Sequence, residues 1–257
     1  METTMSRAAT AVRRMTDRIL PRKEYVEVSG SIIVAPHRRL SGLAFKDNDV
    51  YVKSAEREAQ RLIDYFKCTK ETAILDVGCG QGRLPIGLIR VFGEAAYTGI
   101  DVDKTSVNWC RKFIERKHPS FKFKHLNLYN ERYNTGGQKI DAAFRFDVGA
   151  ASAEIAYLFS VFSHTTEEDM RVYLKDFTRV LTPNGNLFFT TFVEDDVPDF
   201  SINPVNYRLK CSGPLHIVRY NKQYLFSILA ECGYSVVDFT YATESDGQSA
   251  IYLRRTA

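Results

Sequence analysis

The residues best suited to chemistry lie in the stretch ILDVGCGQGR, where three glycines alternate behind a carboxylate. Asp76 ends an apolar run, and Gly78, Gly80 and Gly82 follow it at every second position. Glycine adopts positive φ readily and lets a ligand approach the backbone closely. A dinucleotide fingerprint would need glycine where Arg83 stands, and the Gly-Lys-Ser/Thr of a P-loop is absent. The turn is therefore suited to a ligand with an amino-acid end and a ribose.

A second carboxylate follows at the end of the next expected strand. The sequence there reads TGIDVD, which puts Asp101 about 20 residues beyond the glycine turn. An acidic side chain in this position can accept hydrogen bonds from both hydroxyls of a ribose. The glycine turn and Asp101 together predict a nucleoside-binding site.

Histidine supplies the candidate for proton transfer. His164 ends the fourth expected strand, at the edge of the predicted cleft, and an ordinary histidine pKa of about 6.5 suits a general base. The alternative is that His164 caps the following helix or packs beside the site. His216, in GPLHIVRY, is a candidate for binding a polar substrate group. Tyr220 and Arg38 are further candidates for contacting the acceptor, and both also fit a structural role.

The elements that position these residues alternate along the chain. Apolar runs predict strands at residues 72–77, 96–101, 121–126, 155–162 and 186–193, with helices at 54–66, 81–92, 105–117, 167–181 and 223–232. The segment TPNG at 182–185 predicts a turn. The last two strands, at 235–241 and 249–254, have no helix between them and predict an antiparallel hairpin. We therefore expect an α/β, Rossmann-like, doubly wound and mostly parallel seven-stranded sheet with an antiparallel C-terminal hairpin.

Some segments do not follow the alternation, and they suggest a division of the chain. We expect residues 1–53 to form an N-terminal cover and residues 54–257 to form the ligand-binding domain. The insert at 127–153 and the segment at 194–221 should lie over the substrate site, because irregular segments in such folds usually cover the mouth of the sheet.

The amino-acid composition indicates which partners and which cellular compartment to expect. The 257 residues carry a formal net charge of +4, which is too small to predict a nucleic-acid partner. Five cysteines without a CxxC pair favour free thiols in a reducing compartment, so we expect a cytoplasmic protein. The five histidines are scattered and predict no metal site. Six basic residues before residue 24 are compatible with a basic helix in weak contact with a membrane surface, with a transit peptide or with an ordinary surface helix.

The sequence resembles the class I S-adenosylmethionine-dependent methyltransferases over residues 54–254. The resemblance rests on ILDVGCGQGR, on YTGIDVD, on the strand and helix SVFSHTTEEDMRVYLKDFTRVLTPNGNLFFTTF, and on the final hairpin. Within the superfamily it is similar to a group that acts on small molecules or sugars, whose members carry a W-C-R sequence (here Trp109, Cys110 and Arg111) and an L-Y-N stretch (Leu128, Tyr129 and Asn130). That group reads S-V-F-T-H after the fourth strand, where this chain has SVFSH.

The resemblance implies S-adenosylmethionine as cofactor, S-adenosylhomocysteine as product and no metal. The implied cofactor residues fall in three groups, for the methionyl end, the ribose and the adenine: Asp76, Gly78, Cys79, Gly80 and Gly82; Asp101; and Val102, Asn127 and Leu128. Asn127 stands where family members often have aspartate near the adenine amino group.

The leading hypothesis is O-methylation of a small molecule, such as a natural-product or sugar hydroxyl, with His164 as base. N-methylation of an amine and a non-catalytic cofactor-binding domain are the alternatives. A nucleic-acid acceptor is not expected, because the chain lacks the Asn/Asp-Pro-Pro-aromatic loop and the Pro-Cys pair of nucleic-acid enzymes.

Overall fold

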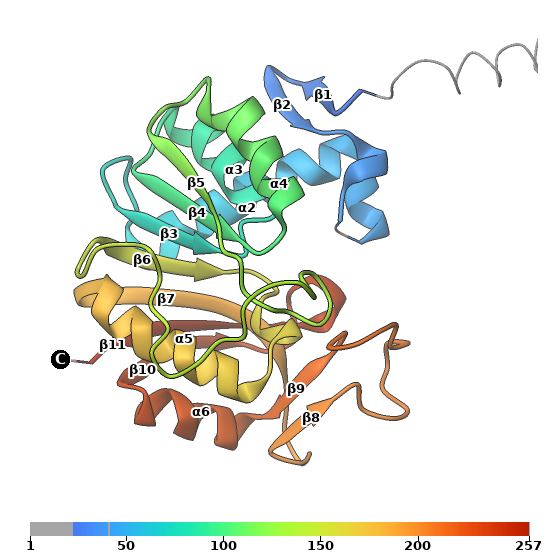
Figure 1. The fold of residues 1–257 in the computed structure, drawn as a ribbon, viewed down its shortest axis with the longest axis vertical. Coiled ribbons are helices and arrows are strands. Elements are labelled where there is room, and N and C mark those ends of the chain that lie inside the picture. Colours follow the sequence, from blue (N-terminus) through green and yellow to red (C-terminus); the bar gives the residue numbers. More distant parts are fainter. Residues whose placement is uncertain (1–22, 41, 257) are drawn as a thin grey trace, which may run out of the picture.

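A computed structural model describes residues 23–40 and 42–256. Its centre is a sheet with the strand order β5-β4-β3-β6-β7-β11-β10 (Figure 1). The strands are β3 (Ile74–Val77), β4 (Tyr97–Asp101), β5 (Phe121–His125), β6 (Ala153–Leu158), β7 (Leu181–Glu194), β10 (Tyr234–Thr240) and β11 (Ser249–Arg255). Strands β3 to β7 are parallel, and β11 is antiparallel to both β7 and β10. The predicted fold class is confirmed.

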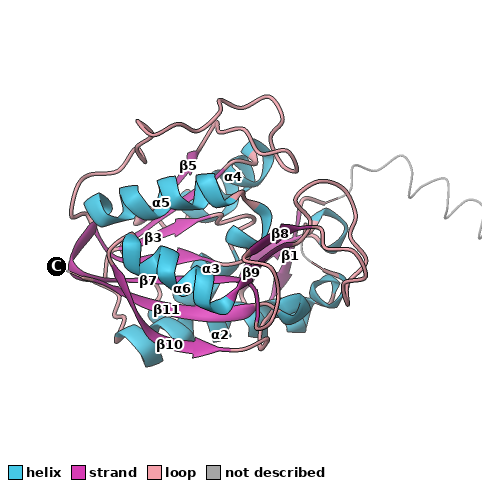
Figure 2. Ribbon diagram, turned by 90° about the horizontal axis from the view of Figure 1, so that it is seen from below, coloured by secondary structure: helices cyan, strands magenta, loops and turns pink. Residues whose placement is uncertain are grey.

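Helices cover both faces of this sheet (Figures 1 and 2). One apolar core joins the sheet to α5 (Glu167–Val180) and α6 (Lys222–Glu231), and the other joins it to α2 (Asn48–Phe66), α3 (Arg83–Phe92) and α4 (Lys104–Cys110). Successive side chains of a strand point to opposite faces. Accordingly Leu75 and Val77 lie in the first core and Ile74 lies in the second.

Two additions extend the sheet fold toward the carboxyl ends of the strands. The N-terminal cover contributes the hairpin β1 (Tyr25–Val28) and β2 (Ser31–Val34), followed by 3-10 helices at Pro36–Arg38 and Leu43–Lys46. The segment after β7 forms β8 (Phe200–Ile202) and β9 (Val218–Asn221), and β9 runs parallel to the last residues of β7. Sequence patterns left both segments unassigned. The insert at 127–153 is a loop with two isolated bridges before β6 begins.

Three predicted boundaries differ from the structure for local reasons. Helix α2 begins at Asn48 instead of residue 54, because the Asp47 side chain accepts a hydrogen bond from the Val50 N–H and caps it. The proposed domain boundary at 53/54 therefore falls inside a helix. Strand β6 ends at Leu158 instead of residue 162, because the chain reverses at Ser160, whose φ is 57°. The predicted turn at 182–185 falls within the residues of β7, where the pairing with β6 skips from Leu181 to Asn186 and the φ of Asn184 is 62°.

A buried polar network ties α2 to the sheet. Glu58 is 2% exposed, and its carboxylate accepts hydrogen bonds from Arg61 Nε at 3.1 Å and from the Tyr157 hydroxyl at 2.6 Å. The Arg61 guanidinium also donates to Glu244 at 2.8 Å and to the Tyr252 hydroxyl at 2.7 Å. These bonds fix the helix against β6 and β11, at the base of the cavity described below.

The described residues contain no helix that is both long and apolar enough to cross a bilayer. The predicted basic helix before residue 24 falls almost wholly on residues outside the described part of the chain, so the expected membrane contact stays a prediction.

Candidate active site

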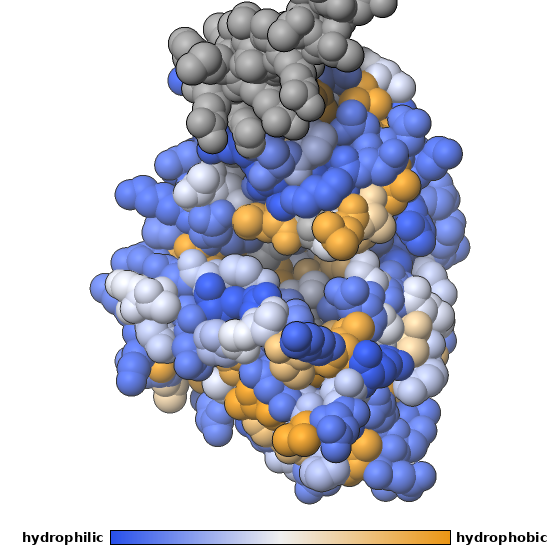
Figure 3. All heavy atoms as spheres, turned by 90° about the vertical axis from the view of Figure 1, so that its right-hand side faces the viewer, coloured by the Kyte–Doolittle hydropathy of each residue, from blue (hydrophilic) through white to orange (hydrophobic). Residues whose placement is uncertain are grey.

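A cavity of about 700 Å³ opens at the carboxyl ends of β3, β4 and β6. Figure 3 shows a hollow in the middle of this face, with hydrophobic residues along its edges. Strand order reverses between β3 and β6, and ligands of open α/β sheets bind at such a switch point. The volume lies within the roughly 300–1,000 Å³ of small-molecule sites. The N-terminal cover, the 127–153 insert and the 194–221 segment all contribute lining residues.

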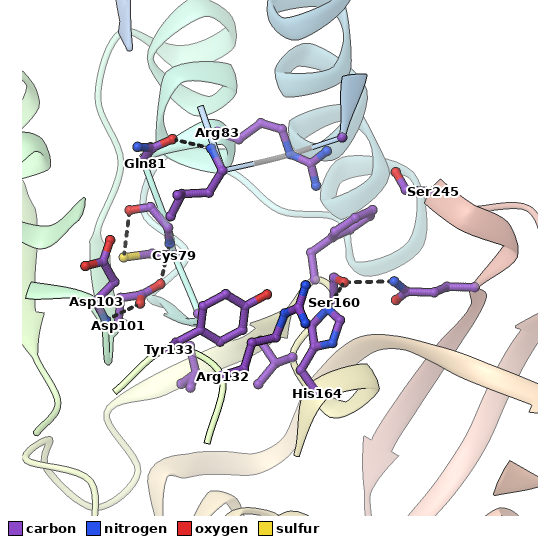
Figure 4. A pocket seen from close by; sticks show the side chains of 18 of the residues that line it. Cys79, Gln81, Arg83, Asp101, Asp103, Arg132, Tyr133, Ser160, His164 and Ser245 are labelled. Carbon is purple, nitrogen blue, oxygen red and sulfur yellow. Dashed lines mark hydrogen bonds between the residues drawn. The ribbon is translucent and has the colours of Figure 1, made fainter. Parts of the chain in front are cut away.

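Asp101 is the anchored carboxylate of this cavity. One of its oxygens accepts a hydrogen bond from the Gly80 N–H at 2.6 Å, and the other accepts from the Asp103 N–H at 2.7 Å. Burial raises the pKa of Asp101 to about 6, although both N–H bonds favour the ionised form. The side chain is therefore held in one orientation at the end of β4, with lone pairs left for hydroxyl donors (Figure 4).

Asp76 lies one strand away, at the wall of the same cavity. It is 2% exposed and accepts a hydrogen bond from the Tyr97 hydroxyl at 2.6 Å. Burial raises the pKa of Asp76 to about 7, so this carboxyl is more readily protonated than an exposed aspartate. Asp76 is thus both a hydrogen-bond acceptor and, when protonated, a donor toward a ligand.

The three glycines have different local roles. A Cβ on Gly80 would meet nothing within 4 Å, so the turn leaves open space at that point of the cavity. A Cβ on Gly78 would lie 2.3 Å from Val161 Cγ2, and the φ of Gly78 is 80°. Gly82 is buried against Ile114 and does not line the cavity. All three positions have positive φ, which favours glycine, and only at Gly80 does the missing side chain leave open space in the cavity.

The expected adenine contacts divide between two places. Val102 lines the main cavity together with Leu126, and Cys79 lines it beside the glycines. Asn127 instead borders a smaller neighbouring hollow, and its amide oxygen accepts a hydrogen bond from Asn134. Leu128 is packed in the apolar core and does not line the cavity. The register at the end of β5 therefore turns Leu126, one residue earlier than expected, toward the ligand space.

His164 is at the wall of the cavity and has a defined tautomer. Its Nδ1 lies 2.9 Å from the carbonyl oxygen of Leu215, which can only accept, so Nδ1 carries the proton and Nε2 is free to accept one. Nε2 is 3.4 Å from Ser160 Oγ. Burial lowers the pKa of His164 to about 4. The imidazole is consequently neutral at physiological pH, as a proton acceptor must be.

Ser160 connects this histidine to the sheet. Its Oγ accepts a hydrogen bond from Gln248 Nε2 at 2.8 Å, and its N–H donates to Thr190 Oγ1 at 2.8 Å. Thr190 Oγ1 in turn donates to Gln248 Oε1 at 2.7 Å. These bonds hold Ser160 in its left-handed conformation. Because Gln248 already donates to Ser160 Oγ, the hydroxyl proton of Ser160 is directed to His164 or to Ser163.

The other predicted substrate residues have different surroundings. His216 lines the cavity, and its ring is parallel to that of His164 with centroids 6.4 Å apart. Tyr220 lies in β9 with 0% exposure and packs on Phe200. The Arg38 side chain pairs with Glu24 at 3.0 Å. Neither Tyr220 nor Arg38 lines the cavity, because the β9 register turns the tyrosine inward and the ion pair draws the arginine away.

Several lining residues were not found from the sequence. Arg83, Arg132, Tyr133 and Ser160 line the cavity (Figure 4), and Gln248 also contributes to its lining. Of these residues, only Arg83 could have been predicted from a sequence motif, since it follows the last glycine of the turn. A further residue of the turn, Gln81, donates from Nε2 to the Arg38 carbonyl at 2.8 Å and accepts from the Leu40 N–H at 3.2 Å, which ties the N-terminal cover to the turn.

Comparison with known proteins agrees with this geometry. A family model described as a methyltransferase domain matches residues 74–185, which hold the glycine turn, Asp101 and His164. Residues 74–185 therefore carry a methyltransferase domain, and the chain has the fold of the class I S-adenosylmethionine-dependent methyltransferases. Within the described residues, no group of three or more His, Cys, Asp or Glu side chains is arranged to hold a metal.

Two curated relatives share part of this methyltransferase sequence. A fatty-acid O-methyltransferase of Mycolicibacterium smegmatis is 26% identical over 46% of this chain and 36% of its own length. A malonyl-acyl-carrier-protein O-methyltransferase of Halalkalibacterium halodurans is 29% identical over 58% of this chain and 50% of its own length. The chain thus spans half or less of the length of these relatives.

A solved structure shares the methyltransferase fold. The cyclase SpnF superposes with a TM-score of 0.56 at 16% identity, over 80% of this chain and 83% of that chain. That protein is named as a [4+2]-cyclase, so this fold alone does not show that a protein transfers methyl groups.

The described residues fit the family's cofactor. S-adenosylmethionine carries a ribose, an adenine and a methionyl end. The anchored carboxylate of Asp101 offers acceptors for two ribose hydroxyls, Val102 and Leu126 offer apolar contact, and the open space above Gly80 admits a ligand close to the backbone.

Proposed function

We propose that this chain transfers the methyl group of S-adenosylmethionine to a hydroxyl of a small molecule. The observation that carries the proposal is that the anchored carboxylate of Asp101 and the unprotonated Nε2 of His164 line one cavity. Both curated relatives are named as O-methyltransferases, which supports an oxygen acceptor.

The chain's own residues have three tasks in this reaction. Asp101 and the glycine turn bind and orient the cofactor, which supplies a methyl group on a sulfonium, a good leaving group. Orientation of two reactants provides much of the rate in such a transfer. His164 Nε2 accepts the proton of the acceptor hydroxyl as the oxygen–carbon bond forms, either directly or through Ser160 Oγ, 3.4 Å away. The Leu215 carbonyl holds the ring in the accepting tautomer.

The test is turnover with and without the base. The full chain is incubated with S-adenosylmethionine and a panel of hydroxylated small molecules, and mass spectrometry follows S-adenosylhomocysteine and the methylated product. With the acceptor so found, His164→Gln should lower kcat by about 100-fold or more while leaving cofactor binding within twofold, as expected when a general base is removed. His118→Gln, which lies outside the cavity, is the matched control and should retain full turnover.

Two results would change the proposal. Near-normal turnover of His164→Gln would refute the base and favour an amine acceptor, since a neutral amine needs less help with its proton. Tight cofactor binding without methylation of any panel member or of a cell extract would favour the non-catalytic alternative.

A further inference from the structure

Arg83 presents a cation to the cavity without a protein partner. It is the first residue of α3, it lines the cavity, and its side chain points into the open space in Figure 4. Among the described residues it takes part in no ion pair within 4.0 Å and its side chain donates no hydrogen bond, whereas Arg61 and Arg179 each donate several. Arg132, on the opposite wall, donates to backbone carbonyls.

Two aromatic rings hold the Arg83 guanidinium in place. Its central carbon is 4.1 Å from the ring centroid of Phe159 and 5.2 Å from that of Phe45. A guanidinium that stacks on an aromatic ring makes a cation–π contact through its flat face. Its N–H donors lie in the plane of the group and stay available for hydrogen bonds to a ligand. The planar fork of donors matches a carboxylate, which it can bind through two parallel hydrogen bonds.

The surroundings of Arg83 select an anion. The carboxylates nearest to it are already bonded: Asp76 accepts from Tyr97, and Asp101 accepts from two backbone N–H groups. Neither approaches within ion-pair distance of Arg83. Phe159, on whose ring Arg83 stacks, immediately precedes Ser160, whose Oγ lies 3.4 Å from His164 Nε2, so Arg83 and the proposed base are positioned by the same short segment after β6.

We propose that Arg83, stacked between Phe45 and Phe159, is a subsite for a carboxylate of the methyl acceptor. The inference rests on the proposed function, because it names the substrate class of the same cavity: a hydroxylated carboxylic acid. The cofactor's methionyl carboxylate has the same chemistry, and the experiment separates the two sources.

Calorimetry on the full chain saturated with S-adenosylhomocysteine provides the test. The probes are 4-hydroxybenzoate with 4-hydroxybenzamide and 3-hydroxydecanoate with its amide, one aromatic and one aliphatic pair. In at least one pair, the wild type should bind the acid tenfold or more tightly than the amide, as expected for hydrogen bonds to a charged group. Arg83→Gln should abolish the difference and Arg83→Lys should keep part of it. Arg254→Gln, an exposed arginine of β11 that does not line the cavity, should leave it unchanged.

The cofactor arm compares S-adenosylhomocysteine with methylthioadenosine, which lacks the amino-acid end. If Arg83→Gln weakens only the former, the carboxylate is the cofactor's, and the acceptor assignment is overturned. Equal binding of acid and amide in both pairs by the wild type also overturns it. Absence of S-adenosylhomocysteine binding by the folded wild type would instead refute the proposed function, which keeps the two failures distinct.

Discussion

Replacing Asp101 by asparagine tests the cofactor site most directly. The side chain keeps its shape but loses its charge and one acceptor oxygen. At present the two oxygens accept from Gly80 N–H at 2.6 Å and from Asp103 N–H at 2.7 Å. An asparagine amide group would face one of these N–H donors with a donor of its own, and it would offer fewer lone pairs to a ribose.

The magnitude follows from the bonds affected. A hydrogen bond to a charged group contributes about 1.5–3 kcal/mol. Losing the charge-assisted ribose contacts, with some disorder of the turn, should weaken S-adenosylhomocysteine binding by about 3 kcal/mol, or roughly 100-fold. Asp47→Asn, a cap residue of α2 outside the cavity, is the matched control and should change the affinity by less than twofold.

The pH dependence of S-adenosylhomocysteine binding is a second, independent test of the role of Asp101. The pKa of Asp101 in the free protein is about 6, and hydroxyl donors favour its ionised form. As pH falls from 7 to 5 the wild-type carboxyl becomes neutral, so the affinity advantage over Asp101→Asn should shrink by up to tenfold for each pH unit below the pKa. Asp76 titrates in both proteins, and its pKa should be lower in Asp101→Asn, because the Asp101 charge is one of the causes that raise it. The assay is calorimetric titration of S-adenosylhomocysteine at several pH values, with thermal melts to confirm folding. An affinity loss below threefold, or an advantage independent of pH, would refute the anchored-carboxylate reasoning.

The remaining predictions concern the frame around the site. Gly78→Ala should destabilise the fold by about 1–3 kcal/mol more than Gly93→Ala, because both residues have a φ of 80° but only at Gly78 does the added Cβ meet a side chain, 2.3 Å away. Equal losses in chemical denaturation would contradict the proposed contact with Val161. Glu58→Gln should cost about 2 kcal/mol and lower Tm by roughly 4–8 °C, because Arg61 keeps Glu244 but loses a buried partner. Glu56→Gln, on the same helix with a half-exposed partner, should cost under about 1 kcal/mol in the same thermal melt, and equal costs would rule out a special role for the buried network.

The sheet was predictable because its signals are local. Each parallel strand is a short apolar run bounded by polar or turn residues, and the pair without an intervening helix identified the hairpin. The edges of elements were less accurate, since they depend on caps and bulges such as those at Asp47 and within 182–185. Strand β8 has three residues without alternating burial, and β9 alternates over only four residues, which is too short a run for the sequence to predict a strand.

The candidate site was predictable only where chemistry and strand ends coincide. Asp76 and Asp101 lie at the carboxyl ends of β3 and β4, and His164 comes shortly after β6, so their convergence follows from topology. The roles of Ser160 and Gln248 depend on a left-handed residue and on a contact 88 positions apart in the chain. Arg83 was visible as a residue type, but its aromatic neighbours come from a 3-10 helix of the cover and from the residue after β6, and no local pattern relates them.

Gln81 links two parts of the cavity wall, the glycine turn and the N-terminal cover. Its amide bridges the carbonyl of Arg38 and the N–H of Leu40, so a single side chain couples the glycine loop to the outer wall. If the N-terminal cover moves to admit a bulky molecule, the two hydrogen bonds to Gln81 transmit that movement to the glycine turn, where the nucleoside would bind. We therefore expect the position of the outer wall and the conformation of the glycine turn to be coupled through these two hydrogen bonds.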